Sequence, residues 1–240
     1  MYSRIAGIFA VLLLLAGPAA AAPIPELSLP VVVPDSLWRP LRETVDDSLQ
    51  ERLESRLKQN ELWADLMKNQ KMAVGLVDLT VPEAPRFARV NGDVMMYAAS
   101  LPKIAILLTA VRALEEGTLK ETPEVMKDLT DMIRKSSNGA ATRTIDRLGG
   151  LEKIESALVN SRYELYDTEK GGGLGIGKRY AKTGAVHGDP LKGLVHGASA
   201  TQVCRFYYLL ATGRLISPAR STQMLELLSS PGIRHKFVQA

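Results

Sequence analysis

The stretch Tyr97-Ala-Ala-Ser-Leu-Pro-Lys-Ile-Ala-Ile-Leu107 lies where a predicted strand gives way to an apolar helix over residues 101–116. Ser100 and Lys103 are three positions apart at the start of this helix. Residues at i and i+3 share a helix face, so the Lys103 amine can reach the Ser100 hydroxyl. A serine hydroxyl is a weak nucleophile that needs a base within hydrogen-bond distance. The spacing therefore predicts a serine nucleophile with a lysine base.

The start of a helix suits this chemistry. Pro102 is tolerated in the first turn, because its missing N–H would be unpaired there anyway. Free backbone N–H groups at a helix start favour a developing oxyanion, and the helix dipole lowers the pKa of a nearby lysine. The pattern is short, however, and its alternative interpretation is a serine N-cap followed by a surface lysine.

A second polar motif, Ser136-Ser137-Asn138, lies between predicted helices over residues 125–134 and 138–148. A loop at this position can present a hydroxyl that relays a proton to a leaving nitrogen. It can also present an amide that holds a substrate carbonyl. The alternative is that Asn138 only caps the following helix, a position that asparagine favours.

Together with Leu148-Gly-Gly150, these two motifs resemble those of class A β-lactamases and penicillin-binding proteins, which carry S-x-x-K, S-D-N and K-T-G. The resemblance covers about residues 45–240 and implies an α+β fold, with a helical subdomain and an antiparallel sheet covered by helices. It also implies four roles: Ser100 as acylated nucleophile, Lys103 as base, Ser136 as proton shuttle, and Asn138 as substrate-binding residue.

Two features depart from the family pattern. Ser137 stands where class A enzymes usually have aspartate. Lys182-Thr183-Gly184 spells K-T-G but precedes the predicted helices 201–210 and 219–228, whereas the family's motif follows them on a strand, so we interpret it as a coincidence. The sequence ends at Ala240, near where the third motif should begin. We therefore expect a truncated sequence that lacks the last strands.

Release of the acyl group is a separate question. In class A β-lactamases a glutamate activates the hydrolytic water, and Glu169 falls at about the matching distance from Ser136. Its sequence context does not match, and a solvated loop carboxylate is the alternative. Without such a base, acylation would proceed but turnover would be slow, as in a penicillin-binding protein.

The first residues predict export. Arg4 precedes an apolar run over residues 5–16, which Gly17-Pro18 and small residues follow, and we predict a signal peptide over residues 1–21. A retained anchor is the alternative, but a membrane span needs about 20 apolar residues. We expect a periplasmic or secreted protein with no stable membrane insertion after cleavage.

The remaining chain divides into two parts. Residues 22–40 carry five prolines and predict an extended lead-in that is not a packed element. We expect residues 41–240 to form a β-lactamase-like domain that is incomplete at its C-terminal end. Other predicted elements are a helix over 41–68, strands over 72–79 and 86–97 with a turn at Asn91-Gly92, and a helix over 152–159. A long glycine-rich loop is predicted over 167–198, and a loop of this length in a compact domain is usually functional.

Composition excludes several classes. The net charge of +4 is scattered, so a nucleic-acid partner is not expected. We predict that Cys204 is a buried structural thiol. The three histidines, His187, His196 and His235, have no metal-ligand spacing, and we expect no metal and no cofactor. The expected partner of a monomeric enzyme is a small-molecule β-lactam or a peptidoglycan peptide. Two other functions are alternatives to this one: a non-catalytic relative that binds the cell wall, and a serine esterase.

Overall fold

The computed structural model describes residues 28–233, which form eight α-helices and small antiparallel sheets. The predicted signal peptide, residues 1–21, and His235 lie outside the described residues. Residues 28–40 contain no helix or strand, as expected of the proline-rich lead-in. This part is nevertheless packed, because Val31 and Val33 are buried and the Arg214 guanidinium donates to the Val33 carbonyl, 3.2 Å away.

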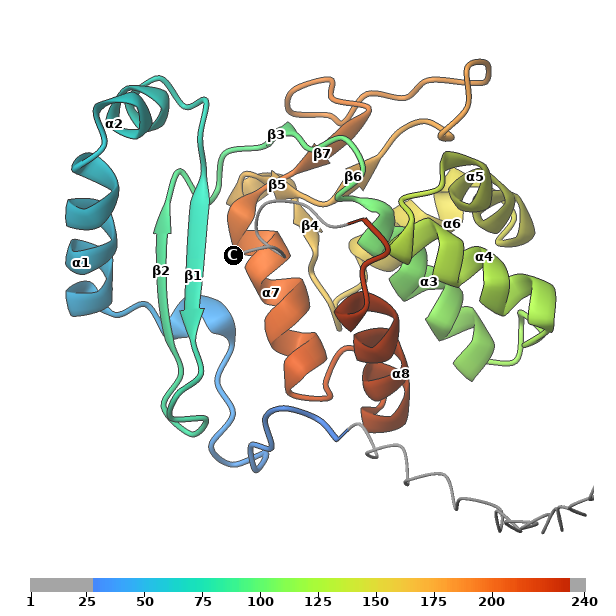
Figure 1. The fold of residues 1–240 in the computed structure, drawn as a ribbon, viewed down its shortest axis with the longest axis horizontal. Helices are drawn as coiled ribbons and strands as arrows, with labels where there is room; N and C mark the ends of the chain where they lie inside the picture. Colours follow the sequence, from blue (N-terminus) through green and yellow to red (C-terminus); the bar gives the residue numbers. More distant parts are fainter. Residues whose placement is uncertain (1–27, 234–240) are drawn as a thin grey trace, which may run out of the picture.

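The first half of the chain forms a hairpin between helices (Figure 1). Strand β1 (Val74–Asp78) pairs antiparallel with β2 (Arg86–Val90). Helices α1 (Asp47–Lys58) and α2 (Glu61–Lys68) lie to one side of the hairpin, and α7 (Ala200–Ala211) packs against β1. A glycine at position 75 permits this packing, because a Cβ there would lie 2.5 Å from Cys204 Sγ on α7.

The single helix predicted over residues 41–68 is divided. A 3-10 turn at Leu41–Glu43 precedes α1, and α1 and α2 are separate helices. The break has a local cause, since the Asn60 side chain accepts a hydrogen bond from the Trp63 N–H and so begins a new helix. The leucine periodicity alone did not contain this capping signal.

The strand predicted over residues 86–97 also belongs to two sheets. The turn at Asn91-Gly92 lies where predicted, and Asn91 adopts a left-handed φ of 51°. Beyond it, β3 (Met96–Tyr97) pairs with β7 (His196–Ala198) and not with the hairpin. The turn therefore redirects the chain from one sheet to the other.

The glycine-rich segment predicted as a structureless loop contains short strands, which corrects that prediction. These are β4 (Tyr166–Asp167), β5 (Gly172–Gly173) and β6 (Gly175–Ile176); β6 pairs with β7, in the sheet order β3-β7-β6. The glycines allow close approach of neighbouring backbones. A Cβ on Gly173 would lie 2.0 Å from the Leu165 carbonyl oxygen.

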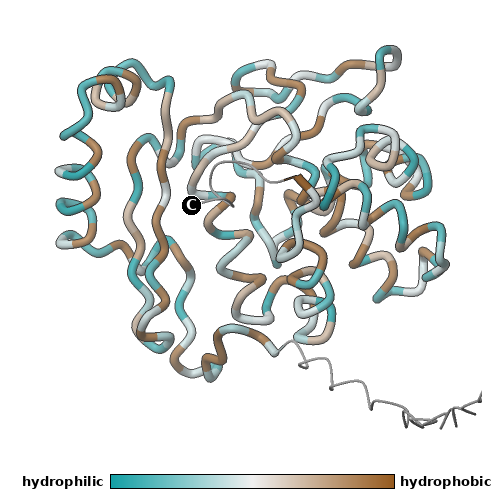
Figure 2. Tube along the Cα trace, viewed as in Figure 1, coloured by the Kyte–Doolittle hydropathy of each residue, from teal (hydrophilic) through white to brown (hydrophobic). Residues whose placement is uncertain are grey.

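The second half of the molecule is a helical body around α3 (Lys103–Glu115). Every α3 residue from Lys103 to Val111 is buried. The surrounding helices are α4 (Pro123–Arg134), α5 (Asn138–Arg147), α6 (Leu151–Leu158) and α8 (Pro218–Ser229), all of which contact α3. Figure 2 shows hydrophilic and hydrophobic residues alternating along the coils of α1 and α4, as expected of helices with one apolar face.

A buried carboxylate joins α4 to α5. Asp128 on α4 is 4% exposed and accepts hydrogen bonds from Arg143 and Arg147 on α5. The two guanidinium groups hold the pKa of Asp128 below its usual range, chiefly through the Arg143 hydrogen bond. This ion pair network holds the second half of α5 against α4. Within residues 28–233, none of the helices is long and apolar enough to cross a membrane.

Candidate active site

Ser100 lies in a tight turn that leads into α3. The Lys103 N–H donates to the Ser100 carbonyl at 3.1 Å, which is the i→i+3 bond of a 3-10 turn. In such a turn the side chains at i and i+3 lie above each other. Lys103 Nζ is accordingly 3.2 Å from Ser100 Oγ. The α-helix begins at Lys103, two residues later than predicted, and this 3-10 turn is the reason.

Lys103 is a buried lysine, with an exposed fraction of only 2%. Oxygen atoms surround its amine. Besides Ser100 Oγ, Nζ contacts the Ser136 carbonyl at 2.6 Å, Ser136 Oγ at 3.1 Å and Asn138 Oδ1 at 2.8 Å. The structure thus brings Ser100, Lys103, Ser136 and Asn138 together at one atom.

Burial sets the protonation of Lys103. Loss of water disfavours the charged amine and lowers the pKa of Lys103 from 10.5 to about 8. Roughly a tenth of the amines are then neutral at pH 7, whereas an exposed lysine would have almost none. A neutral amine beside a hydroxyl can accept its proton, so this pair can act as nucleophile and base.

The loop between α4 and α5 presents two oxygens to Lys103 because of one unusual backbone conformation. Ser136 has a φ of 53°, in the left-handed region that non-glycine residues rarely adopt. This conformation directs both its carbonyl and its hydroxyl at Nζ. Such strain costs about 1–3 kcal/mol and is concentrated at functional sites in proteins.

Ser137, and not Asn138, caps α5. The Ser137 Oγ accepts a hydrogen bond from the Ala140 N–H at 3.2 Å, as an N-cap side chain does. Asn138 is the first residue of the helix, and its amide oxygen is engaged by Lys103. The capping role considered for Asn138 therefore belongs to its neighbour, which leaves the Asn138 NH₂ group to bind another molecule.

A backbone donor lies beside the nucleophile. Among the contacts between residues 28 and 233, none uses the N–H of Ser100. This group precedes a helix, where backbone N–H groups and the dipole favour negative charge. It is therefore available to an oxyanion that forms when Ser100 Oγ attacks a carbonyl carbon.

Sequence reasoning missed two residues of the site, Tyr180 and His196. The Tyr180 ring centroid is 4.6 Å from Lys103 Nζ, and the ring stacks on His196 with centroids 4.3 Å apart. Both residues are remote in sequence from the two motifs, so no spacing pattern connects them. The one available signal was the length and glycine content of the segment over residues 167–198, which predicted a functional region.

Two other sequence features form no hydrogen bond or ion pair with this cluster within the described residues. Glu169 is exposed in a short 3-10 helix (Thr168–Lys170), and no hydrogen bond or ion pair within the described region joins its carboxylate to the cluster. Lys182-Thr183-Gly184 is an exposed part of the loop between β6 and β7. Neither segment contacts Ser100 or Lys103 through a hydrogen bond.

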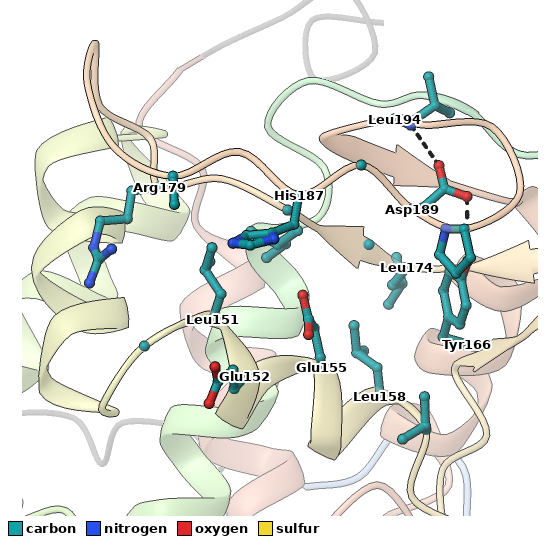
Figure 3. Close-up of a pocket in the computed structure, with 18 of the residues that line it drawn as sticks. Leu151, Glu152, Glu155, Leu158, Tyr166, Leu174, Arg179, His187, Asp189 and Leu194 are labelled. Atoms are coloured by element: carbon teal, nitrogen blue, oxygen red, sulfur yellow. Dashed lines mark hydrogen bonds between the residues drawn. The ribbon is translucent and has the colours of Figure 1, made fainter.

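A cavity of about 590 Å³ lies between α6 and the loop that follows β6 (Figure 3). Glu155 from α6 and His187 from the loop both point into it (Figure 3). Gly177 and Arg179 also line it, whereas Tyr180 contacts Lys103, so one segment borders both the cavity and the Ser100 cluster. In the part of the chain that the structure describes, no three His, Cys, Asp or Glu side chains are grouped to hold a metal ion.

Comparison with known proteins gives a result for the fold. No protein-family model matches the sequence, and no curated protein matches it with significant similarity. Solved structures do match. A β-lactamase from Sphaerobacter thermophilus DSM 20745 has a TM-score of 0.52 and 18% identity, over 70% of this chain and 66% of that chain. This chain thus spans just under two thirds of that enzyme.

Two further structures agree with this result. A mutant class A β-lactamase of the last common ancestor of Gram-negative bacteria has a TM-score of 0.53 and 18% identity, over 71% of this chain and 69% of that chain. A mutant of PBP-A, in an acyl-enzyme complex with penicillin G, has a TM-score of 0.55 and 18% identity, over 82% and 73% of the two chains. With its helical body and small antiparallel sheets, the chain therefore has the β-lactamase-like fold shared by class A β-lactamases and PBP-A.

Proposed function

We propose that this chain is an exported serine hydrolase that is acylated at Ser100 by a β-lactam or a related peptidoglycan amide. One observation carries the proposal: a buried lysine amine lies 3.2 Å from Ser100 Oγ and also contacts Ser136 Oγ and Asn138 Oδ1. The acyl-enzyme of a PBP-A mutant with penicillin G supports the choice of a β-lactam.

The proposed reaction begins with proton transfer. Neutral Lys103 Nζ accepts the proton of the Ser100 hydroxyl, and Oγ attacks the carbonyl carbon of the amide. The negative charge develops on the carbonyl oxygen, near the free N–H of Ser100. The Asn138 NH₂ group would hold a second carbonyl of the substrate.

The tetrahedral intermediate then collapses. Ser136 Oγ gives its proton to the leaving nitrogen and receives the one held by Lys103, whose Nζ is 3.1 Å away. The carbon–nitrogen bond breaks, and Ser100 is left as an ester. General acid–base groups of this kind contribute about 10²- to 10⁴-fold to the rate.

A second candidate is a penicillin-binding enzyme with slow release of the acyl group. The exposure of Glu169 favours it, because within residues 28–233 no hydrogen bond or ion pair joins its carboxylate to the Ser100 cluster. In this candidate, acylation occurs as above and the ester persists. A non-catalytic relative would not require a lysine whose pKa burial lowers, so that part of its amine is neutral near pH 7. No observation favours a simple esterase.

Export and domain limits belong to the same proposal. A signal peptide over residues 1–21 would deliver the protein to the periplasm or the medium, where peptidoglycan and β-lactams are found. The lead-in over residues 22–40 would then precede a catalytic domain over residues 41–240. N-terminal sequencing of the protein recovered from the periplasm tests the cleavage site, which we expect after Ala21.

The test of function is covalent labelling of the full chain with a fluorescent penicillin. We expect one acyl group per chain by intact mass, with the modified peptide containing Ser100. Ser100→Ala should abolish labelling, whereas Ser161→Ala, at an exposed serine after α6, should label normally. Labelling that survives Ser100→Ala would refute the mechanism. Nitrocefin turnover then separates the two candidates, because the hydrolase turns over and the penicillin-binding enzyme does not.

A further inference from the structure

An aromatic side chain contacts both Lys103 and the residue that precedes Ser100. Tyr180, in the segment after β6, has its ring centroid 4.6 Å from Lys103 Nζ. Its hydroxyl donates to the Ala99 carbonyl oxygen, 3.1 Å away. Ala99 is the residue before Ser100, so one tyrosine contacts the base through its ring face and the nucleophile's turn through its hydroxyl.

The Tyr180 ring is itself held in place. His196 on β7 stacks against it at an interplanar angle of 12°, and His196 Nε2 lies 3.1 Å from the Lys178 carbonyl oxygen. His196 is 8% exposed. The stack therefore joins three elements that are distant in sequence: β7, the segment after β6, and α3.

We propose that Tyr180 is a positioning residue that holds the Lys103 amine and the turn before Ser100 in the arrangement that acylation requires. The inference rests on the proposed function of Ser100, but it concerns a contact that can be measured without substrate.

The ring face acts on the charge of Lys103. An aromatic ring attracts an ammonium group through its quadrupole, and this stabilises the protonated amine. The other groups that face Nζ are the hydroxyls of Ser100 and Ser136, the Ser136 carbonyl and the Asn138 amide oxygen. Within the described region, no carboxylate hydrogen-bonds or forms an ion pair with Nζ, so the charge of Lys103 is stabilised by these oxygen atoms and by the ring face of Tyr180.

The titration of His196 does not overlap with that of Lys103. Burial, followed by the nearby positive charges of Lys103 and Lys178, lowers the pKa of His196 below 6.5, against the opposing effect of the Lys178 carbonyl. The imidazole is therefore neutral at the higher pH values where Lys103 titrates. A transition near pH 8 in the acylation rate would report Lys103 and not His196.

The hydroxyl acts on the backbone. Ala99 has a φ of 48°, in the left-handed region, and this conformation turns the chain from β3 into the turn that carries Ser100. A residue in this region needs support from its surroundings. The hydrogen bond from Tyr180 provides such support at the carbonyl adjoining the nucleophile.

Three variants of the full chain separate these two contacts. Tyr180→Phe keeps the ring and loses the bond to Ala99, and Tyr180→Leu loses both contacts while keeping an apolar side chain. Tyr207→Leu, at a half-exposed tyrosine of α7, is the control. The readouts are the acylation rate against pH with a fluorescent penicillin, and the Lys103 Nζ titration by NMR on ¹⁵N-lysine protein, assigned with Lys103→Arg.

We expect Tyr180→Phe to lower the plateau acylation rate about three- to tenfold, with an unchanged midpoint near pH 8. Tyr180→Leu should move the midpoint to lower pH by up to about one unit, in both the rate profile and the NMR titration. A residue with only a structural role would lower the rate without moving either midpoint. Tyr207→Leu should change neither.

A folded Tyr180→Leu whose Lys103 midpoint stays or rises overturns the proposal. If that variant fails to fold, Tyr180→Phe decides, and a plateau rate equal to that of the unmodified chain overturns it. If the unmodified chain is not acylated at all, the proposed function fails. The NMR midpoints of the same variants then still confirm or refute the contact between Tyr180 and Lys103.

Discussion

The shortest contact of Lys103 Nζ is with the backbone carbonyl of Ser136, at 2.6 Å. The amine is therefore anchored to the main chain of the α4–α5 loop more closely than to any hydroxyl. This arrangement separates two roles of Ser136, because its carbonyl positions the base while its hydroxyl is free to move a proton. Removing the hydroxyl should leave the base in place.

Ser136→Ala tests this separation. We expect the acylation rate to fall about 10²- to 10³-fold, because the leaving nitrogen loses its proton donor. The midpoint of the pH profile should remain near 8, because the carbonyl contact persists. Stopped-flow labelling with a fluorescent penicillin measures both quantities. A large shift of the midpoint would contradict the separation.

The acylation rate should depend on pH through Lys103. The amine must be neutral to accept the Ser100 proton, and burial lowers its pKa to about 8. The rate should therefore fall tenfold for each pH unit below 8 and reach a plateau above it. Labelling rates between pH 6 and pH 9.5 measure the profile. A flat profile across this range would exclude Lys103 as the base.

Asp128→Asn should destabilise the protein. It removes the buried charge that holds Arg143 and Arg147. Breaking a fully buried ion pair costs about 3–5 kcal/mol. Because both arginines are partly exposed, we expect the free energy of unfolding to fall by a smaller amount, about 2–3 kcal/mol. Urea unfolding followed by circular dichroism measures it. Lys127→Ala breaks an exposed pair with Asp131 and should cost under about 0.5 kcal/mol. Equal losses for the two variants would contradict the role of Asp128.

Two glycines should respond in opposite ways to alanine. A Cβ on Gly177 would lie 1.5 Å from the His187 carbonyl oxygen, so Gly177→Ala should cost about 1–3 kcal/mol. It should also reduce acylation, because this backbone leads to Tyr180. A Cβ on Gly139 in α5 would lie 3.3 Å from Arg143 Nη1 and 4.0 Å from Ser137 Oγ, with no backbone atom in the way, so Gly139→Ala should stabilise by about 0.5 kcal/mol. Thermal unfolding of both variants is the measurement.

Glu169→Gln tests the release of the acyl group. If the exposed Glu169 has no part in activating water, the lifetime of the penicillin adduct should be the same in the variant and the unmodified chain. Intact-mass measurements over time after a single labelling pulse give that lifetime. An adduct that lasts more than tenfold longer in Glu169→Gln would restore this residue as the hydrolytic base.

Local patterns predicted a large part of the fold. The α+β, β-lactamase-like fold is confirmed, and helices α3 to α8 lie within two residues of their predicted limits, because their apolar periodicity agrees with their burial. The β-strands were harder to predict. Strands β5 to β7 contain only two or three residues each and are rich in glycine. Their backbones approach closely, so they lack the side-chain alternation that normally predicts a strand.

The candidate site shows the same division. Ser100 and Lys103 are neighbours along the chain, so their spacing already predicted their contact. Ser136 and Asn138 could be joined to them only through a family resemblance, since a loop 33 residues away reaches the same amine. Tyr180 and His196 have no local signal, because their contacts depend on how β6 and β7 place two distant segments beside α3.

Ser137 has a consequence for recognising related sequences. Because its side chain caps α5 and does not face Lys103, the middle position of the second motif is constrained by helix initiation. Aspartate, asparagine, serine and threonine all perform that task. A sequence pattern that demands aspartate there would overlook chains built in this way, whereas one that accepts any helix-capping residue between the shuttle serine and the asparagine would retrieve them.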